Sequence, residues 1–399
     1  MSGLSCFPQY ISRKIIKMDR IRRRIYQIHL VIKLFFFKIA SRFNKKEEFW
    51  LISERGKEAR DNGYALYRWI KKNHPEQKVK FIISSNSKDL NRIEPEDRIE
   101  FNSAKHYLAI WNAKCLISTH IMGYTPDLVF FSMLDKKYNI LRGKTKIFLQ
   151  HGIIKDKLEG LFHGNINVNL FISGSDIEFH YLSDNFGFPT GIIRYTGLCR
   201  FDNLMNYKSK KQILIMPTFR MYADRNNFEE SEYFKAYRDL LSSNSFHEIL
   251  EMYDYSVIFY PHYEFQSKID SFKAINISSR ITIADMNYDV QTLLKESEIL
   301  VTDFSSVFFD MMYMNKPVIF YQFDEEQYRK EHYKQGYLNY NDVGPVVKTA
   351  DSLITIIKTV VSNKDCIAPY QDYYNKTFPI RDSNNCLRVF NAIKHVLHE

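Results

Sequence analysis

Two histidines stand directly after apolar runs that are typical of buried strands, one in each half of the chain. His151 and Gly152 follow the run 146–150, and His262 follows the run 256–260 after a proline that stiffens the exit. Imidazole titrates near neutral pH, so either ring can take a proton from an attacking hydroxyl or give one to a leaving group. The alternatives are structural: a loop histidine bonded to backbone, or a capping or packing histidine.

A second group of polar side chains follows the apolar run 299–301. Thr302, Ser305 and Ser306 stand where a helix over 307–314 is expected to begin. Asp310 lies four residues after Ser306, on the same face of that helix. Free backbone N–H groups at a helix start attract anions, and hydroxyls add donors for phosphate oxygens. The motif therefore indicates an anion site, with an ordinary helix N-cap as the alternative.

Weaker candidates lie at other expected strand ends and loops. Pro217 and Thr218 follow a predicted strand, and Arg220 is close behind. A hydroxyl and a guanidinium there can hold a nucleotide or phosphate. Arg200 lies at the expected domain junction, and Asp289 starts a predicted helix as either a cap or a ligand contact. No GxGxxG or Walker loop follows any of these strands.

The elements that would position these residues are short apolar runs alternating with amphipathic segments. This alternation is typical of a parallel sheet with helices on both faces, where ligands bind beyond the carboxyl ends of the strands. The predicted strands are 49–52, 79–84, 114–118, 146–150, 170–173, 192–195, 212–216, 256–260, 280–283, 299–301, 317–320 and 345–347. We expect an α/β, GT-B-like architecture: two Rossmann-like doubly wound domains with a cleft between them, across which the two histidines face each other.

The amino-terminal segment differs from the rest in charge and pattern. Residues 1–48 carry +9 of the net charge of +10, and a near-neutral body with one basic end argues against a nucleic-acid binder. Apolar residues recur every three or four positions from Ile11 to Phe43, although no uncharged run reaches the roughly 18 residues that span a bilayer. The pattern predicts an amphipathic helix on anionic lipid, with a core or dimer helix as the alternative.

Length and cysteine usage set further bounds. The 399 residues suit two domains, which we place at 47–205 and 206–399 after the basic segment 1–46. Five dispersed cysteines without CxxC spacing favour a reducing compartment over a zinc site or a disulfide framework. No compact carboxylate cluster demands a metal, so a Mg²⁺ requirement stays open.

The order of these motifs along the chain resembles that of the CDP-glycerol glycerophosphotransferase family, whose members build and prime teichoic acids and some phosphate-containing capsules. The resemblance runs over residues 49–358. Its motifs are 59–67, 150–152, 197–203, 216–220, 260–263, 300–310, 315–321 and 344–345. One departure from the family pattern is 153–156, where many relatives continue the first histidine motif with Thr-Pro-Leu-Lys.

The resemblance implies a phosphotransferase at the cytoplasmic face of a bacterial membrane, attached peripherally. It implies that His151 and His262 are essential, and that the CDP-alditol is contacted by Thr218, Ser305, Ser306 and Asp310. The expected donor is CDP-glycerol or CDP-ribitol, bound by the carboxyl-terminal domain. The acceptor is a hydroxyl of a lipid-linked wall teichoic acid or capsular polymer on the amino-terminal side, and CMP is released.

Two other functions stay open at this point. One is a GT-B glycosyltransferase that uses a nucleotide-sugar, because the fold does not exclude it. The other is a non-catalytic, membrane-bound binding subunit. The alditol, the acceptor, primase against polymerase action, and a homo-oligomeric state are also undecided by the sequence.

Overall fold

The computed structural model describes residues 20–43, 48–205, 207–225, 227–332, 334–363 and 365–398. It divides into two compact units. Unit 1 consists of Met1–Ile153, Leu158–Asn203 and Asp382–Glu399, and unit 2 consists of Ile154–Lys157 and Leu204–Arg381. The chain passes from unit 1 to unit 2 after Asn203, close to the boundary expected near residue 205. Two short segments differ from the expected division: 154–157 belongs to unit 2, and 382–399 belongs to unit 1.

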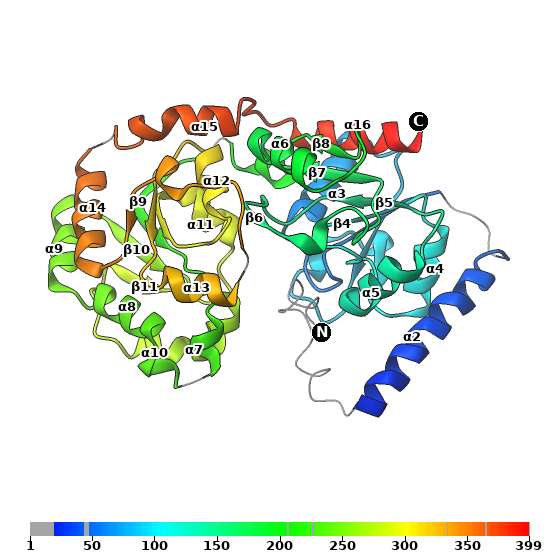
Figure 1. Ribbon diagram of the computed structural model, residues 1–399, viewed down its shortest axis with the longest axis horizontal. Helices are drawn as coiled ribbons and strands as arrows, with labels where there is room; N and C mark the ends of the chain where they lie inside the picture. The colour runs from blue at the N-terminus through cyan, green and yellow to red at the C-terminus, as the bar shows by residue number, and fades with distance from the viewer. Residues whose placement is uncertain are drawn as a thin grey trace. The chain divides into compact units, whose positions relative to one another are not determined.

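Unit 1 is built on a seven-stranded parallel sheet (Figure 1). In spatial order its strands are β3 (Arg98–Glu100), β2 (Val79–Ile83), β1 (Trp50–Ser53), β4 (Cys115–Ser118), β5 (Thr145–Phe148), β7 (Leu170–Ser173) and β8 (Ile193–Tyr195). The chain reverses its direction of progress between β1 and β4. The carboxyl ends of these two strands therefore flank the switch point, where doubly wound sheets bind ligands.

Helices cover both faces of this sheet. They are α2 (Arg20–Ala40), α3 (Asn62–Asn73), α4 (Ala104–Asn112), α5 (Leu128–Tyr138), α6 (Asp176–Asn185) and α16 (Asn385–Leu397). One apolar cluster joins α2, α4 and α5 to the sheet and contains Leu51 of β1. On the opposite face Trp50 packs against Phe390 of α16, with ring centroids 5.1 Å apart. Trp50 and Leu51, which are adjacent in β1, thus pack on opposite faces of the sheet.

Helix α16 belongs to unit 1 although the sequence placed 206–399 in one domain. The Asp202 carboxylate accepts the backbone N–H groups of Asn385 (2.8 Å) and Cys386 (2.9 Å) at the start of α16. The Arg388 guanidinium donates to the Thr196 carbonyl oxygen at 2.8 Å. These contacts, 183 residues or more apart in sequence, are long-range and leave no local pattern in the chain.

The helix expected in the amino-terminal segment is present as α2, and the part before residue 20 lies outside the described residues. Leu30 and Leu34 are 1% exposed and pack on unit 1, where Trp111 donates its indole N–H to the Leu34 carbonyl oxygen at 2.8 Å. The predicted apolar stripe points elsewhere: Ile25 and Ile32 are 61% and 62% exposed. Within the described residues, no helix is both long enough and apolar enough to cross a membrane.

Unit 2 is built on a six-stranded parallel sheet of the same doubly wound kind (Figure 1). Its strands, in spatial order, are β11 (Ile281–Ile283), β10 (Ser256–Phe259), β9 (Lys210–Ile215), β12 (Ser297–Thr302), β13 (Val318–Tyr321) and β15 (Val346–Val347). The switch point lies between β9 and β12. A separate antiparallel pair joins β6 (Asp156–Lys157) to β14 (Lys334–Gln335), which is why 154–157 falls in unit 2.

The helices of unit 2 are α7 (Met221–Arg225), α8 (Glu232–Leu241), α9 (Asn244–Tyr253), α10 (Ile269–Lys273), α11 (Val290–Glu296), α12 (Phe308–Tyr313), α13 (Glu325–Glu331), α14 (Ala350–Ser362) and α15 (Gln371–Thr377). A large cluster rich in aromatic rings joins α8, α9, α10 and α14 to one face of the sheet. Helices α11 and α12 contact β12. Leu300 of β12 is buried outside the aromatic cluster, whereas its neighbour Val301 lies within it, as alternation along a strand requires. The predicted fold class, two doubly wound α/β units, is confirmed.

Candidate functional site

His151 stands just beyond the carboxyl end of β5, in a loop that several side chains hold. Gln150 before it has φ +60°, a left-handed conformation uncommon outside glycine, which turns the chain sharply at the edge of the sheet. The Asn62 amide donates to the Gln150 carbonyl oxygen at 2.8 Å, and the Arg200 guanidinium donates to that of His151 at 2.9 Å. Arg200 also pairs with Asp61 at 3.2 Å. The loop backbone is thereby clamped by groups from the starts of two other elements.

The His151 ring is held in a state suited to accept a proton. The backbone of Thr119 lies near the ring and favours its charged form, as a carbonyl oxygen facing a ring N–H does. In a neutral imidazole the other nitrogen then keeps a lone pair. Crowding by protein lowers the pKa of His151 to about 4, and the positive charges of Arg55 and Arg200 lower it further. The residue still exposes surface, so the neutral ring is accessible to a hydroxyl.

A second histidine that sequence reasoning missed lies beside the first. His120 follows the neighbouring strand β4, and its ring stacks on that of His151 with centroids 4.5 Å apart and planes 7° from parallel. The Thr119 hydroxyl lies 2.9 Å from His120 Nδ1. The signal was available, since Thr119 and His120 follow a predicted strand just as His151 does.

In unit 2, Thr218 and Asp303 meet across the switch point. Thr218 follows β9 and Asp303 follows β12. The Thr218 backbone N–H donates to both oxygens of the Asp303 carboxylate, at 3.0 and 3.1 Å, and its hydroxyl donates to the same group. The Thr218 side chain is partly exposed, whereas Asp303 is fully buried. Asp303 therefore fixes the loop that carries Thr218, whose hydroxyl is directed at that carboxylate.

Arg220 has a different place from the one expected. Its side chain is completely buried, so in this structure it cannot touch a donor. Its guanidinium pairs with Asp303 at 2.9 Å and with Asp324 at 2.6 Å, and the Tyr222 hydroxyl donates to Asp324 at 2.6 Å. Burying one cation between two carboxylates satisfies all three groups. We assign Arg220 a positioning role, in place of the predicted contact with a phosphate.

His262 follows strand β10, as predicted. In the sheet, β10 and β12 lie on opposite sides of β9. Its Nδ1 accepts the backbone N–H of Glu264 at 3.3 Å, so the capping alternative is part of its role. Since Nδ1 is an acceptor, we infer that the neutral ring carries its proton on Nε2. Burial lowers the pKa of His262 to about 4; Asp303 opposes this shift, while Arg220 and His332 add to it. A neutral His262 can thus donate a hydrogen bond from Nε2.

The serine motif after β12 divides into accessible and buried members. Ser305 and Ser306 are partly exposed. Thr302 is 1% exposed and its hydroxyl donates to the Met216 carbonyl oxygen at 2.7 Å, and Asp310 is 1% exposed within α12. Thr302 and Asp310 therefore do not offer the donor contact expected of them. Helix α12 is also shorter than the expected run 307–314.

The remaining predicted residues lie as follows. Gly152 is partly exposed beside His151, whereas Pro217 is buried before Thr218 and Arg200 is 9% exposed. Asp289 caps α11, where its carboxylate accepts the Thr292 backbone N–H at 2.9 Å, so the capping alternative describes it. Among the residues that the structure describes, no three His, Cys, Asp or Glu side chains are grouped to hold a metal ion.

Comparison with known proteins identifies the family of this chain. The family model described as CDP-glycerol:poly(glycerophosphate) glycerophosphotransferase matches residues 34–395. The minor teichoic acid biosynthesis protein GgaB of Bacillus subtilis (strain 168) is 32% identical over 369 residues, 88% of this chain and 40% of that protein. The teichoic acid glycerol-phosphate transferase of Staphylococcus aureus (strain NCTC 8325 / PS 47) is 24% identical over 393 residues, 90% of this chain and 95% of that one. The chain spans about half the length, or less, of GgaB and of three other curated relatives it matches.

Solved structures show the same fold. A structure of the wall teichoic acid polymerase TagF superposes with a TM-score of 0.68 at 18% identity, covering 96% of this chain and 99% of that one. A putative UDP-N-acetylglucosamine 2-epimerase from Listeria monocytogenes gives 0.58 at 14% identity, covering 88% and 97%. The match to the family model extends over nearly the whole chain and includes both histidine loops and the serine motif. The resemblance inferred from the motifs is confirmed, and this chain belongs to the CDP-glycerol:poly(glycerophosphate) glycerophosphotransferase family.

Proposed function

We propose that this enzyme transfers an alditol phosphate from a CDP-activated donor, CDP-glycerol or CDP-ribitol, to a hydroxyl of a lipid-linked teichoic acid or capsular polymer. The observation that carries the proposal is the state of His151: an accessible, neutral imidazole whose one nitrogen is engaged by Thr119 and whose other nitrogen keeps its lone pair. The family match and the naming of TagF structures with CDPG support the donor class.

We assign these groups the following roles in the reaction. The acceptor oxygen attacks the β-phosphorus, which bears the alditol, while His151 takes the hydroxyl proton. A new P–O bond forms, the bond from the β-phosphorus to the bridging oxygen breaks, and its electron pair leaves with CMP. His262 donates from Nε2 to the departing phosphate, and Ser305 and Ser306 supply hydroxyl donors to the diphosphate. The Thr218 hydroxyl joins them when it turns from Asp303 to the donor. Such transfer depends mostly on positioning and charge stabilisation.

Product analysis tests this proposal. Purified protein is given CDP-glycerol or CDP-ribitol with a lipid-linked acceptor, and the products are identified by mass spectrometry. We expect the acceptor to gain alditol phosphate units through phosphodiester bonds, with one CMP released per unit. A glycosidic product from a nucleotide-sugar would support the glycosyltransferase alternative, and donor binding without turnover would support the non-catalytic one.

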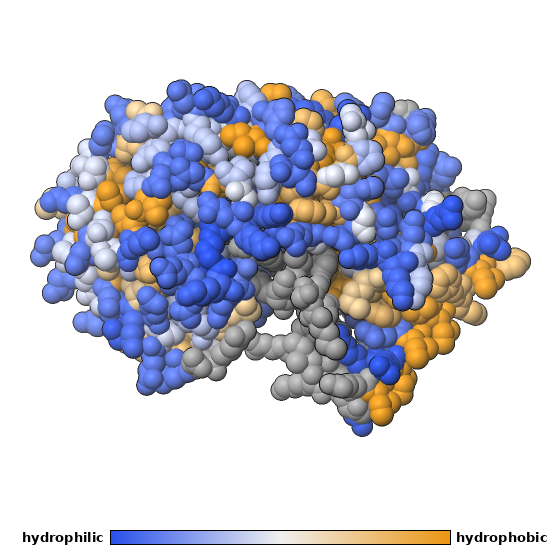
Figure 2. All heavy atoms as spheres, viewed as in Figure 1, coloured by the Kyte–Doolittle hydropathy of each residue, from blue (hydrophilic) through white to orange (hydrophobic). Residues whose placement is uncertain are grey.

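We also propose that α2 binds an anionic membrane surface, as expected for residues 11–43 at the cytoplasmic face. The helix is anchored to unit 1 by Leu30 and Leu34, yet it exposes a row of large apolar residues along its length: Ile21, Ile25, Ile28, Ile32, Phe35, Phe36 and Ile39. Phe43, just beyond its end, is exposed as well. Figure 2 shows hydrophobic side chains gathered on this helix. Exposed Arg22 and Arg24 lie on the same helix. Apolar surface beside clustered cations matches the chemistry of an anionic bilayer interface.

Vesicle flotation tests the role of α2. The double variant Ile25→Asp/Ile32→Asp is expected to lose binding to vesicles containing phosphatidylglycerol, because two carboxylates would enter the apolar layer. Arg22→Gln/Arg24→Gln is expected to weaken binding by roughly 30-fold, at about 1 kcal/mol per arginine. Met252→Asp, at an equally exposed apolar position (68%) on α9, is the control. Unchanged flotation, with the Asp variants shifting a dimer to a monomer in sedimentation, would favour the dimer-helix alternative.

A further inference from the structure

The two stacked imidazoles come from neighbouring strands of the unit 1 sheet. His120 follows β4 and His151 lies beyond β5, and these strands pair in parallel from Cys115 to Ser118. Parallel neighbours bring their carboxyl ends to the same edge. A centroid distance of 4.5 Å with planes 7° apart is a face-to-face stack, so one face of the His151 ring is covered by the His120 ring.

One residue, Thr119, contacts both rings. The Thr119 backbone faces the His151 ring, where it favours the protonated form, and the Thr119 hydroxyl lies 2.9 Å from Nδ1 of His120. The two rings are therefore tied to one point of the β4 loop. A displacement of either ring relative to the other would break one of these contacts or open the stack.

The loop that carries His120 is itself closely built. The His120 backbone N–H donates to the Ser118 hydroxyl at 3.2 Å, and its carbonyl oxygen accepts the Gly123 N–H at 2.9 Å. A side chain at Gly123 would place its Cβ 2.3 Å from that same hydroxyl, so only glycine fits. Such a loop can fix the orientation of the His120 ring.

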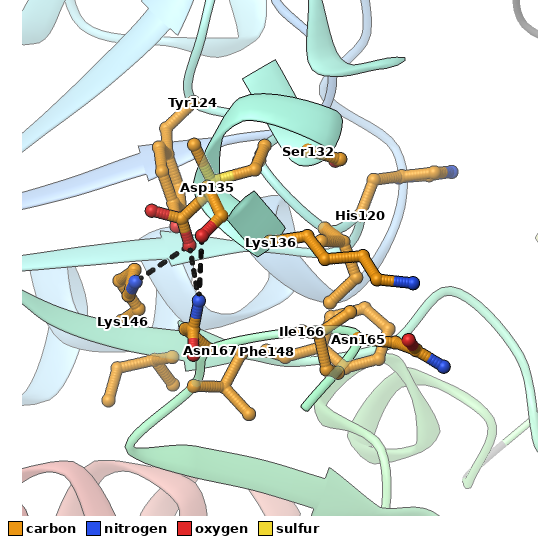
Figure 3. A pocket seen from close by; sticks show the side chains of 14 residues that line it. His120, Tyr124, Ser132, Asp135, Lys136, Lys146, Phe148, Asn165, Ile166 and Asn167 are labelled. Carbon is orange, nitrogen blue, oxygen red and sulfur yellow. Dashed lines mark hydrogen bonds and ion pairs between the residues drawn. The ribbon is translucent and has the colours of Figure 1, made fainter. Parts of the chain in front are cut away.

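A small pocket of the same unit adjoins His120. His120 contributes to its wall, together with Tyr124, Ser132 and Asp135. Figure 3 shows Lys146 and Asn167 directed at the Asp135 carboxylate, and Lys146 forms an ion pair with it at 2.9 Å within the protein interior. The pocket is narrow, and its carboxylate Asp135 is neutralised by Lys146, so we assign it no ligand.

We propose that His120 is a positioning residue for the transfer reaction: its ring fixes the plane of the His151 imidazole and keeps water from one face of it. This inference rests on the proposed function, in which His151 takes the acceptor proton. It adds a third histidine to the two that the sequence motifs indicate. The reacting nitrogen of His151 must point at an acceptor hydroxyl, and a misplacement of about 1 Å can cost about 100-fold in rate.

The charges around the pair agree with this role. His151 faces Arg55 from the β1 end and Arg200 from the segment after β8, and both guanidinium groups oppose its protonation. Desolvation, His151 and Arg55 together hold the pKa of His120 well below its usual value. Neither ring is therefore charged at neutral pH. Removing His120 would open the covered face of the His151 ring to water as well, and the pKa of His151 would rise from about 4 toward the ordinary value of about 6.5.

The test compares three variants of the full chain. His120→Ala removes the ring, His120→Phe keeps a flat ring without the Thr119 contact, and His120→Asn keeps a polar group without a stack. His180→Ala is the matched control, because His180 lies on α6 of the same unit with a side chain 67% exposed. Two readouts are used: the pH profile of kcat/KM with CDP-glycerol, and the titration of the His151 ring by NMR in ¹³C-histidine-labelled protein.

We expect His120→Ala to lower kcat by about 10- to 100-fold and to move both the acid limb of kcat/KM and the His151 titration upward by about one pH unit or more. His120→Phe should restore most of both, and His180→Ala should match the parent. If the alanine variant does not fold, the Phe and Asn variants give the same comparison. Equal rates and an unmoved His151 titration in Asn and Phe variants would overturn the inference. Absence of turnover in the parent protein would instead overturn the proposed function. The NMR titration of His151 can be measured without turnover, so the two failures are distinguishable.

Discussion

Replacing His151 by alanine is expected to lower kcat for alditol phosphate transfer by at least about 100-fold, the usual contribution of a general base. The reason is that the variant loses the lone pair that would take the acceptor proton. The loop backbone should stay in place, because Asn62 and Arg200 hold the carbonyl oxygens of residues 150 and 151 and not the imidazole. Donor affinity, measured by calorimetry with CDP-glycerol, should therefore change little.

The pH dependence gives a second measure of the same group. His151 acts as a base only when it is neutral, and its pKa in the free protein is lowered to about 4. Activity as kcat/KM should hold from neutral pH down to about pH 5 and fall below it, as the ring takes up a proton. A bound diphosphate favours the charged ring, so the acid limb of kcat should lie at higher pH than that of kcat/KM.

His180→Ala again controls for the loss of an imidazole as such. Near-parental turnover in His151→Ala, with the protein folded, would contradict the assignment of His151 as the base.

Replacing Arg220 by methionine is expected to lower the free energy of unfolding of unit 2 by about 3–5 kcal/mol. The change leaves Asp303 and Asp324 without their cation, in a site where Arg220 and Asp303 expose no surface and Asp324 very little. An unpaired buried carboxylate costs far more than the apolar contacts of methionine return. Asp303 also orients Thr218, so donor affinity should fall with stability.

Two spectroscopic signals distinguish the unfolding of unit 1 from that of unit 2. All three tryptophans of the chain, Trp50, Trp69 and Trp111, lie in unit 1, so tryptophan fluorescence follows that unit alone. Circular dichroism reports both units. We expect the denaturation midpoint of the circular dichroism signal to fall while that of tryptophan fluorescence stays near the parental value.

Arg238→Met is the matched control for this prediction. It removes an arginine from an exposed pair with Asp239 on α8, which should cost less than about 1 kcal/mol. An Arg220→Met variant as stable as Arg238→Met would refute the role given to the buried cluster.

The strands were readable from the sequence wherever a buried run ends at a turn. The run 170–173 was predicted with its observed bounds, because every residue of β7 is buried. Strand β3 was missed, since Ile99 is its one apolar residue and it lies at the sheet edge. Strands β6 and β14 have two residues each, too few to show any period. What decides their pairing is a contact between segments far apart in the chain.

The sequence predicted which site residues follow strands, but it did not predict which way their side chains point. Strand ends alone placed His151, His262 and Thr218 at the carboxyl edges of their sheets. Nothing local to Arg220 shows that it is enclosed, because Asp303 and Asp324 lie 83 and 104 residues away. His120 was missed for a simpler reason: the rule that found His151 was not applied to the end of the preceding strand.

The placement of α16 in unit 1 has a consequence for how the chain matures on the ribosome. Residues 382–399 complete unit 1, yet the whole of 204–381 is synthesised before them. At about 5–20 residues per second, the amino-terminal sheet waits roughly 10–35 s for its closing helix, while unit 2 already has all of its chain. During that interval the surface that Phe390 later covers, including Trp50, stays open to chaperones and to other nascent chains.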